Sequence, residues 1–318
     1  MRSFKTYWDK FGTLGMLLLI GAGLSIASPR FFLTLDNITQ IGLQSTVFLL
    51  LAYGEFFAIL IAGIDLSVGA VAGLTGMLTA MMMNAGVPVF YAVLLGLLCA
   101  AIFGAINGTL INLTGLHPFV ITLGTLSIYR GITLIISNGR PVFNFPPSFR
   151  IIAGWVEGIP VPIVIALVTA VILSFFTRKT VLGRNIYALG GNKQAAWYSG
   201  INIKRHVLIV HSLASLLAGT AGIVMTARIG AAEPLAGQGY ETFAIAACII
   251  GGTSFFGGKG KIFGVVIGGL IIGTINNGLN ILNVPSFWQQ VVMGSLIIGS
   301  VSLDKLVGSS VGRKMKTG

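Results

Sequence analysis

Residues 42–86, GLQSTVFLLLAYGEFFAILIAGIDLSVGAVAGLTGMLTAMMMNAG, decide the fold class because they carry almost no charge. This stretch of 45 residues contains no Lys or Arg and only two acidic residues, Glu55 and Asp65. A soluble globular domain has about 25% charged residues, whereas the whole chain has 9%, together with 55% hydrophobic residues. The sequence therefore predicts an all-α integral membrane protein.

Apolar runs of about 20 residues, the length that crosses the hydrocarbon layer, recur along the whole chain. We predict about ten such spans in a single transmembrane domain, residues 1–318, and the division between the second and third spans depends on Asp65 alone. The predicted spans are 12–28, 42–63, 66–86, 89–113, 118–137, 159–177, 206–227, 240–258, 262–283 and 287–303.

The distribution of Lys and Arg predicts the orientation, because these residues concentrate on the cytoplasmic side of membrane proteins. With a cytoplasmic N-terminus, fifteen of the 20 Lys and Arg residues fall in the tails and inside loops, and four fall in outside loops. We therefore expect both termini in the cytoplasm. The same bias explains most of the net charge of +12, and because the basic residues are scattered over several loops we expect no binding to nucleic acid.

The N-terminal stretch also resembles a secretory signal peptide, because Lys5 and Lys10 precede an apolar run that ends in Ser25-Ile26-Ala27. Removal of this stretch would leave nine spans and place the new N-terminus outside. We expect the first span to be retained, since many hydrophobic segments follow it and no extracellular domain is recognisable.

Two loops are long enough to carry information. The predicted periplasmic loop, 138–158, combines three prolines with four aromatic residues, which could anchor it at the membrane surface or form a docking surface for an external protein. The predicted cytoplasmic loop, 178–205, has six positive charges and no acid. Within it we expect Gly190 and Gly191 to break the chain.

A short helix is predicted in the same cytoplasmic loop, over residues 193–198. Asn192 can cap its start and Gly200 can end it. Such a helix could lie on the lipid headgroups, or it could insert into a groove of a cytoplasmic partner. The residues alone do not decide between these two interpretations of the helix.

The glycine-rich stretch GGTSFFGGKGKIFG, 251–264, is reminiscent of a nucleotide-binding loop but fails its pattern. A P-loop requires G-x-x-x-x-G-K-[ST], whereas Thr253 stands at the first glycine position and Gly260 follows Lys259. We therefore expect a sharp turn here and no ATP hydrolysis by this chain.

Polar residues inside the predicted spans are the candidates for a substrate path, because they are costly in hydrocarbon unless they have a function. The candidates for the substrate path are Glu55, Asp65, Ser67, Thr122, Thr125, Asn276, Asn277 and Asn280. Of these, Glu55 could pair with Arg130, be protonated or face a water-filled path.

The three asparagines illustrate the ambiguity of such residues. Asn276 and Asn280 are four residues apart and share one helical face, with Asn277 beside them. Amides both donate and accept hydrogen bonds, so they suit ligands rich in hydroxyl groups. They also stabilise contacts between membrane helices, and the sequence permits either role.

Asp65 has two interpretations as well. It can cap the first turn of the third span, where its charge would interact favourably with the helix dipole. It can also mark a helix break that shapes a translocation path, as discontinuous helices do in transporters.

The three histidines, at positions 117, 206 and 211, fall near predicted span ends without metal-ligand spacing, and Cys99 and Cys248 imply no disulfide.

Four motifs together resemble one family, the permease subunits of bacterial ATP-binding-cassette (ABC) importers for ribose, galactose, xylose and allose. The motifs are AGIDLSVGA (62–70), LGRNIYALGGNKQAAWYSGI (182–201), GTSFFGGKGKIFGVVIGG (252–269) and INNGLN (275–280). The runs GEFFAILIAGIDLSVGA, GLHPF and IGAAEPLAG bring the chain closest to the allose branch of that family.

The resemblance implies a bacterial inner-membrane permease that pairs with a second copy, a cytoplasmic ATPase and a periplasmic sugar-binding protein. ATP and magnesium would be bound by the ATPase, so this chain would carry no cofactor, no metal and no catalytic residue. The loop 178–205 would hold the coupling helix that contacts the ATPase. The residues expected to form this contact are Gly190, Gly191, Asn192, Ala195, Ala196, Ser199 and Gly200.

Two other classes of protein compete with the importer permease. A secondary transporter would be driven by an ion or proton gradient, with Glu55 as a relay. A membrane enzyme would need a convergent set of catalytic side chains, which the sequence does not indicate. We favour the importer permease because the four motifs occur together.

Overall fold

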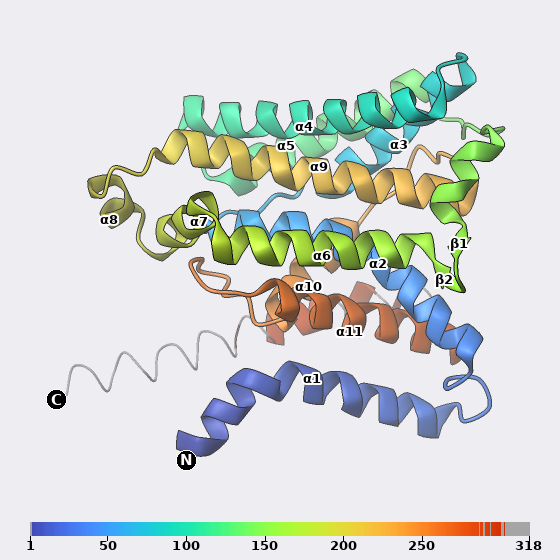
Figure 1. Ribbon diagram of the computed structural model, residues 1–318, viewed down its shortest axis with the longest axis horizontal. Coiled ribbons are helices and arrows are strands. Elements are labelled where there is room, and N and C mark those ends of the chain that lie inside the picture. Colours follow the sequence, from blue (N-terminus) through green and yellow to red (C-terminus); the bar gives the residue numbers. More distant parts are fainter. Residues whose placement is uncertain (1, 286, 289, 293, 300–301, 303–318) are drawn as a thin grey trace.

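The computed structural model describes residues 2–285, 287–288, 290–292, 294–299 and 302, and helices dominate it (Figure 1). The helices are α1 Arg2–Ala27, α2 Leu35–Leu60, α3 Val68–Asn84, α4 Val89–Thr114, α5 Pro118–Ser137, α6 Val161–Lys179, α7 Val181–Gly191, α8 Lys193–Tyr198, α9 Ile203–Ile229, α10 Tyr240–Ile250 and α11 Ile262–Ile281. A 3-10 helix, η1 (Pro147–Ala153), precedes the antiparallel strands β1 (Trp155–Val156) and β2 (Ile159–Pro160).

The prediction of a multi-pass helical membrane protein is confirmed. Six described helices, α2, α4, α5, α6, α9 and α11, are long and apolar enough to cross a membrane. Four shorter apolar helices, Gly12–Ala27, Val68–Asn84, Tyr240–Ile250 and Gln290–Gly299, overlap the remaining predicted spans. The number of crossings and the side of the termini stay predictions, and the span 287–303 lies partly outside the described residues.

Two predicted boundaries are wrong. The span 240–258 ends as a helix at Ile250, because the chain then turns through Gly252, whose φ is +83°. Gly190 and Gly191 do not break the chain, since they form the last residues of α7. The helix predicted over 193–198 is confirmed as α8.

The helices run roughly side by side, so the bundle has two ends (Figure 1). The N-terminus, α7 and α8 lie at one end, which we call the α8 end. The segments η1, β1 and β2 lie at the other, which we call the η1 end. The loops 178–205 and 138–158 are thus at opposite ends of the bundle, as their predicted opposite membrane sides require.

Helix α2 forms the centre of the bundle and packs against α6, α9, α10 and α11. Every residue of α2 from Ser45 to Leu60 is buried. Small residues allow close approach of backbones: a Cβ at Gly54 would lie 2.7 Å from the carbonyl oxygen of Ala214 on α9. A polar group in this buried part of α2 can therefore find a partner only within the protein.

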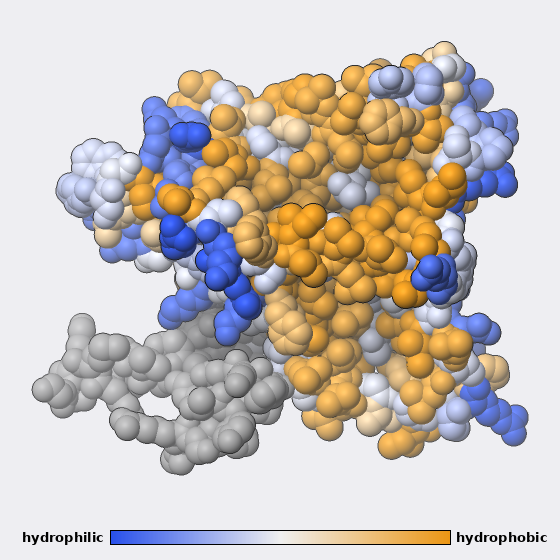
Figure 2. Space-filling view, in the orientation of Figure 1, coloured by the Kyte–Doolittle hydropathy of each residue, from blue (hydrophilic) through white to orange (hydrophobic). Residues whose placement is uncertain are grey.

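On the face shown in Figure 2, the surface is apolar between the two ends, and hydrophilic residues gather at both ends. Exposed residues in this zone include Leu98 of α4 and Val171 and Phe175 of α6. This pattern suits a protein whose flanks face lipid hydrocarbon. In the loop 138–158, Trp155 is 60% exposed but Phe149 is fully buried, so only some of its aromatics are available to an interface.

Candidate functional site

The helical chain is interrupted between α2 and α3, over residues 61–67 near the α8 end. Ala62 adopts a left-handed conformation with a φ of +59°. Asp65 lies in this break with no exposed surface. A carboxylate at this depth requires partners, because a buried unpaired charge is strongly unfavourable.

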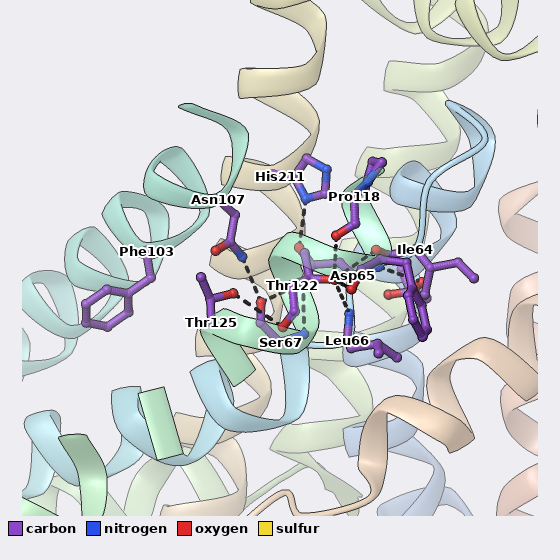
Figure 3. A network of polar contacts seen from close by, with 12 residues as sticks. Ile64, Asp65, Leu66, Ser67, Phe103, Asn107, Pro118, Thr122, Thr125 and His211 are labelled. Carbon is purple, nitrogen blue, oxygen red and sulfur yellow. Dashed lines mark hydrogen bonds and ion pairs between the residues drawn. The ribbon is translucent and has the colours of Figure 1, made fainter. Parts of the chain in front are cut away.

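His211 of α9 is the main partner of Asp65 (Figure 3). Its Nδ1 lies 2.8 Å from Oδ2 of Asp65, and both side chains are fully buried. Oδ1 of Asp65 accepts the backbone N–H of Ser67 at 3.0 Å and its hydroxyl at 2.5 Å. The predicted capping role of Asp65 is confirmed only in part: Asp65 accepts a backbone N–H at the start of the third span, but Ser67 occupies the N-cap position of α3.

The polar contacts continue from Ser67 into α4 and α5 (Figure 3). Asn107 Nδ2 donates to Ser67 Oγ at 2.8 Å, and the Tyr129 hydroxyl lies 3.2 Å from Asn107 Oδ1. The Thr122 hydroxyl accepts the N–H of Leu66 at 3.1 Å, which fixes the break against α5. We call these connected side chains the Asp65 network: Glu55, Asp65, Ser67, Asn107, Thr122, Tyr129 and His211.

Glu55 belongs to the Asp65 network but does not pair with Arg130. Its Oε1 accepts the N–H of Asp65 at 3.2 Å. Arg130 instead donates from Nη1 to the carbonyl oxygens of Pro234 at 3.1 Å and Ala236 at 2.7 Å. Glu55 lines neither the cavity of about 1030 Å³ at the α8 end nor the cavity of about 320 Å³ near the η1 end.

The asparagines of α11 lie away from this network. Asn276 and Asn280 line a cavity of about 320 Å³ in the half of the bundle nearer the η1 end. Asn277 turns toward the start of α2, where its Nδ2 donates to Asn37 Oδ1 at 2.8 Å. Thr125, the remaining substrate-path candidate, donates to the carbonyl oxygen of Thr122 at 3.3 Å. The structure thus separates the eight candidates into two regions.

Several residues of both regions could not be recognised as site residues from the sequence. His211 was expected at a span end, yet it lies in the interior, 146 positions from Asp65. Gln44, Arg228 and Tyr240 line the cavity beside the asparagines. No local pattern connects these residues, and only the buried Asp65 signalled that a distant partner must exist.

Helix α7 packs against the end of α2, next to the helix break at residues 61–67, through close backbone contacts at glycine residues. A Cβ at Gly190 would overlap the carbonyl oxygen of Leu60, the last residue of α2. The same carbonyl accepts the N–H of Gly258 at 2.9 Å. Burial raises the pKa of the Tyr187 phenol above its ordinary value, so the phenol stays protonated and donates to the carbonyl oxygen of Gly260 at 2.9 Å.

Helix α8 projects from the α8 end as a capped, single short helix. Asn192 Oδ1 accepts the N–H of Ala195 at 2.9 Å, which is the side-chain cap that the sequence predicted. Ala196 is buried, whereas Trp197 and Tyr198 are 60% and 75% exposed. The helix ends at Ser199, whose hydroxyl donates to the carbonyl oxygen of Ala195.

The turn after α8 is made by Gly200, with a φ of +81°. A second cavity, of about 1030 Å³, lies between this turn, α8 and the segment 115–118 that joins α4 to α5. Within the part of the chain that the structure describes, no three His, Cys, Asp or Glu side chains gather where a metal ion could bind.

An apolar helical bundle with a polar network at a helix break defines the class: a multi-pass membrane protein whose polar interior is organised around α2. The chain belongs to the family described as branched-chain amino acid transport system / permease component, whose model matches residues 37–301. No solved structure matches the chain.

Curated relatives cover nearly the whole chain. The D-allose transport system permease protein AlsC of Escherichia coli (strain K12) is 59% identical over 96% of this chain and 94% of its own length. The ribose import permease protein RbsC of Bacillus subtilis (strain 168) is 44% identical over 95% and 94%. The L-arabinose transport system permease protein AraH of Escherichia coli (strain K12) is 35% identical over 95% and 92%.

Proposed function

We propose that the chain is the permease subunit of an ABC importer that moves a monosaccharide, D-allose or a ribose-like sugar, across the bacterial inner membrane. The 59% identity to a D-allose permease over 96% of this chain carries the proposal. The ribose and arabinose permeases among the relatives support the same class of substrate. The family description names amino acids, but these more similar proteins are named for sugars.

In this proposal the chain is not an enzyme, because ATP and magnesium are bound by a separate cytoplasmic ATPase. Two permease copies pair, a periplasmic binding protein delivers the sugar, and the sugar passes between the copies. The exposed Trp197 and Tyr198 on α8 suit a helix that inserts into a groove of the ATPase.

The contacts of α7 supply a physical route from α8 to the membrane interior. Because Gly190 packs directly on the backbone of Leu60, a displacement of α8 and α7 moves the end of α2. Leu60 precedes the break that Asp65 and His211 hold in place. Motion driven by the ATPase thus reaches the helix break and reorients α2 relative to α3, which is the alternation of access that import requires.

Sugar uptake into proteoliposomes tests the proposal. The permease is reconstituted with its ATPase and binding protein, and labelled D-allose uptake is measured with and without ATP and each partner. Gly200→Glu, which puts a charged residue at a φ of +81° beside α8, is expected to abolish uptake. Gly86→Glu is the matched control: it introduces the same charge at a φ of +88° near the opposite end, and uptake should persist.

Uptake that requires ATP and both partners, and that is lost only in Gly200→Glu, supports the importer. Uptake by the permease alone under a proton or ion gradient would overturn it and favour a secondary transporter. In that case Glu55 would be the first residue to substitute.

A further inference from the structure

The cavity near the η1 end is formed by side chains from four helices that lie far apart in the sequence. The lining residues that carry the argument are Gln44 and Phe48 of α2, Arg228 of α9, Tyr240 of α10, and Asn276 and Asn280 of α11. Its volume, about 320 Å³, is at the lower end of the range of about 300–1,000 Å³ for small-molecule sites. The space fits one small ligand.

Asn276 presents an unmet hydrogen-bond acceptor in this region. Its side chain is 5% exposed, and Nδ2 donates to the carbonyl oxygen of Ile272 at 3.1 Å. Its Oδ1 has no partner among the described residues. Buried polar groups are normally paired, so a ligand that donates a hydrogen bond would complete this amide.

Arg228 adds hydrogen-bond donors at a fixed position. Nη1 donates to the carbonyl oxygen of Leu43 at 2.7 Å, which holds the guanidinium against α2. A guanidinium has five N–H donors in total, so others can reach a ligand. Among the described residues that line the cavity, Arg228 is the only charged one, which favours a neutral or anionic ligand over a cation.

Aromatic rings form the apolar wall of the cavity. The ring of Phe48 lies 5.4 Å from that of Tyr240 and 5.0 Å from that of Phe243, between centroids. Amide and guanidinium groups beside such a wall suit a small molecule with hydroxyl groups on its edge and C–H groups on its faces. A monosaccharide has both features.

We propose that this cavity is a binding site for the transported monosaccharide. Asn276 Oδ1 accepts a hydrogen bond from a sugar hydroxyl, Gln44 and Arg228 bond further oxygens, and the rings of Phe48 and Tyr240 cover a sugar face. The inference rests on the proposed function and deepens it, because it names residues that contact the sugar on each of the two copies between which it passes.

Reconstituted complexes with substituted cavity residues test the site. Gln44→Ala and Asn276→Ala are each expected to lower D-allose uptake per ATP hydrolysed roughly fivefold, the effect of one lost hydrogen bond. ATP hydrolysis stimulated by the binding protein should stay near that of the unsubstituted complex. Gln40→Ala is the matched control, because Gln40 is exposed on the same helix one turn away and does not line the cavity.

A labelling experiment probes sugar contact directly. In Asn280→Cys, we expect D-allose at high concentration to slow modification by a small thiol reagent, beyond the background from Cys99 and Cys248. Unchanged labelling, or uptake in Gln44→Ala and Asn276→Ala equal to that in Gln40→Ala, would overturn the site while leaving the importer intact. Absence of ATP-driven uptake by the unsubstituted complex would overturn the proposed function itself.

Discussion

The Asp65 network and the cavity near the η1 end both place polar side chains inside an apolar bundle, but they differ in what those side chains contact. In the network, Asp65 is bonded by His211 and Ser67, and Asn107 continues the chain of contacts to Tyr129. In the cavity, the polar groups surround open space of about 320 Å³.

Unmet polar atoms occur in both regions, so they do not by themselves distinguish them. His211 Nε2 and Glu55 Oε2 are buried without a partner in the described part of the chain, as is Asn276 Oδ1. Asn276 lines the cavity near the η1 end, whereas His211 and Glu55 do not. A buried polar group that borders open space can bind a ligand, whereas one that is packed on all sides can only stabilise the fold. Burial and charge do not make this distinction.

The largest expected effect is the loss of stability in Asp65→Ala. This change leaves His211 and Ser67 without their buried partner, which should lower the free energy of unfolding by about 3–5 kcal/mol. Thermal unfolding of the purified full-length chain measures it. Asp36→Ala is the control, because Asp36 is exposed in the first turn of α2 and should cost less than about 1 kcal/mol.

A double variant sharpens this prediction. In Asp65→Leu with His211→Leu neither side chain of the pair is left buried without its partner, so the two changes together should cost less than Asp65→Ala alone. Equal stability of Asp65→Ala and Asp36→Ala would show that the network does not hold the break.

An intermediate effect is expected where α7 meets the break. In Gly190→Ala the added Cβ overlaps the carbonyl oxygen of Leu60, and such overpacking should destabilise the chain by about 1–3 kcal/mol and reduce ATP-driven uptake. In Gly191→Ala the Cβ meets no described atom within 4 Å, so the free energy of unfolding should be preserved. If the two variants behave alike, α7 is not rigidly joined to α2.

The smallest effect on stability is expected in the cavity. Asn276→Ala removes one hydrogen bond within α11 and should change the free energy of unfolding by less than about 1 kcal/mol. The same thermal unfolding experiment measures it beside Asp65→Ala. A decrease in the free energy of unfolding as large as that of Asp65→Ala would contradict the difference between the two regions.

Features with local causes were predictable from the sequence. The apolar stretches correspond to helices, because hydrocarbon excludes any backbone that does not satisfy its own hydrogen bonds. Helix α8 was predicted residue by residue, since the side-chain cap of Asn192 and the left-handed turn at Gly200 act within a few residues. Helix α7 was missed because Gly190 and Gly191 have low intrinsic helix propensity, which its packing against α2 overrides.

Several residues of the candidate site could be picked out from the sequence by their type, but their arrangement in space could not. Asn276, Asn277 and Asn280 were placed on one stretch of helix, yet the structure directs Asn277 to Asn37 and leaves the other two at the cavity. Arg130 and Glu55 have opposite charges and each lies inside a predicted span, but Arg130 donates to backbone carbonyls of the segment 230–239. Charge alone does not fix which side chains meet.

The sequence by itself determined that this protein is a helical membrane protein, where its polar residues interrupt the spans and where the short helix α8 begins and ends. These properties follow from hydrophobicity and from hydrogen bonds between near neighbours. Only the tertiary structure decided that Asp65 meets His211, that Gly190 packs on Leu60 and that Gln44, Arg228 and Asn276 share a cavity. Those contacts depend on how helices distant in the chain pack and rotate, which no local pattern records.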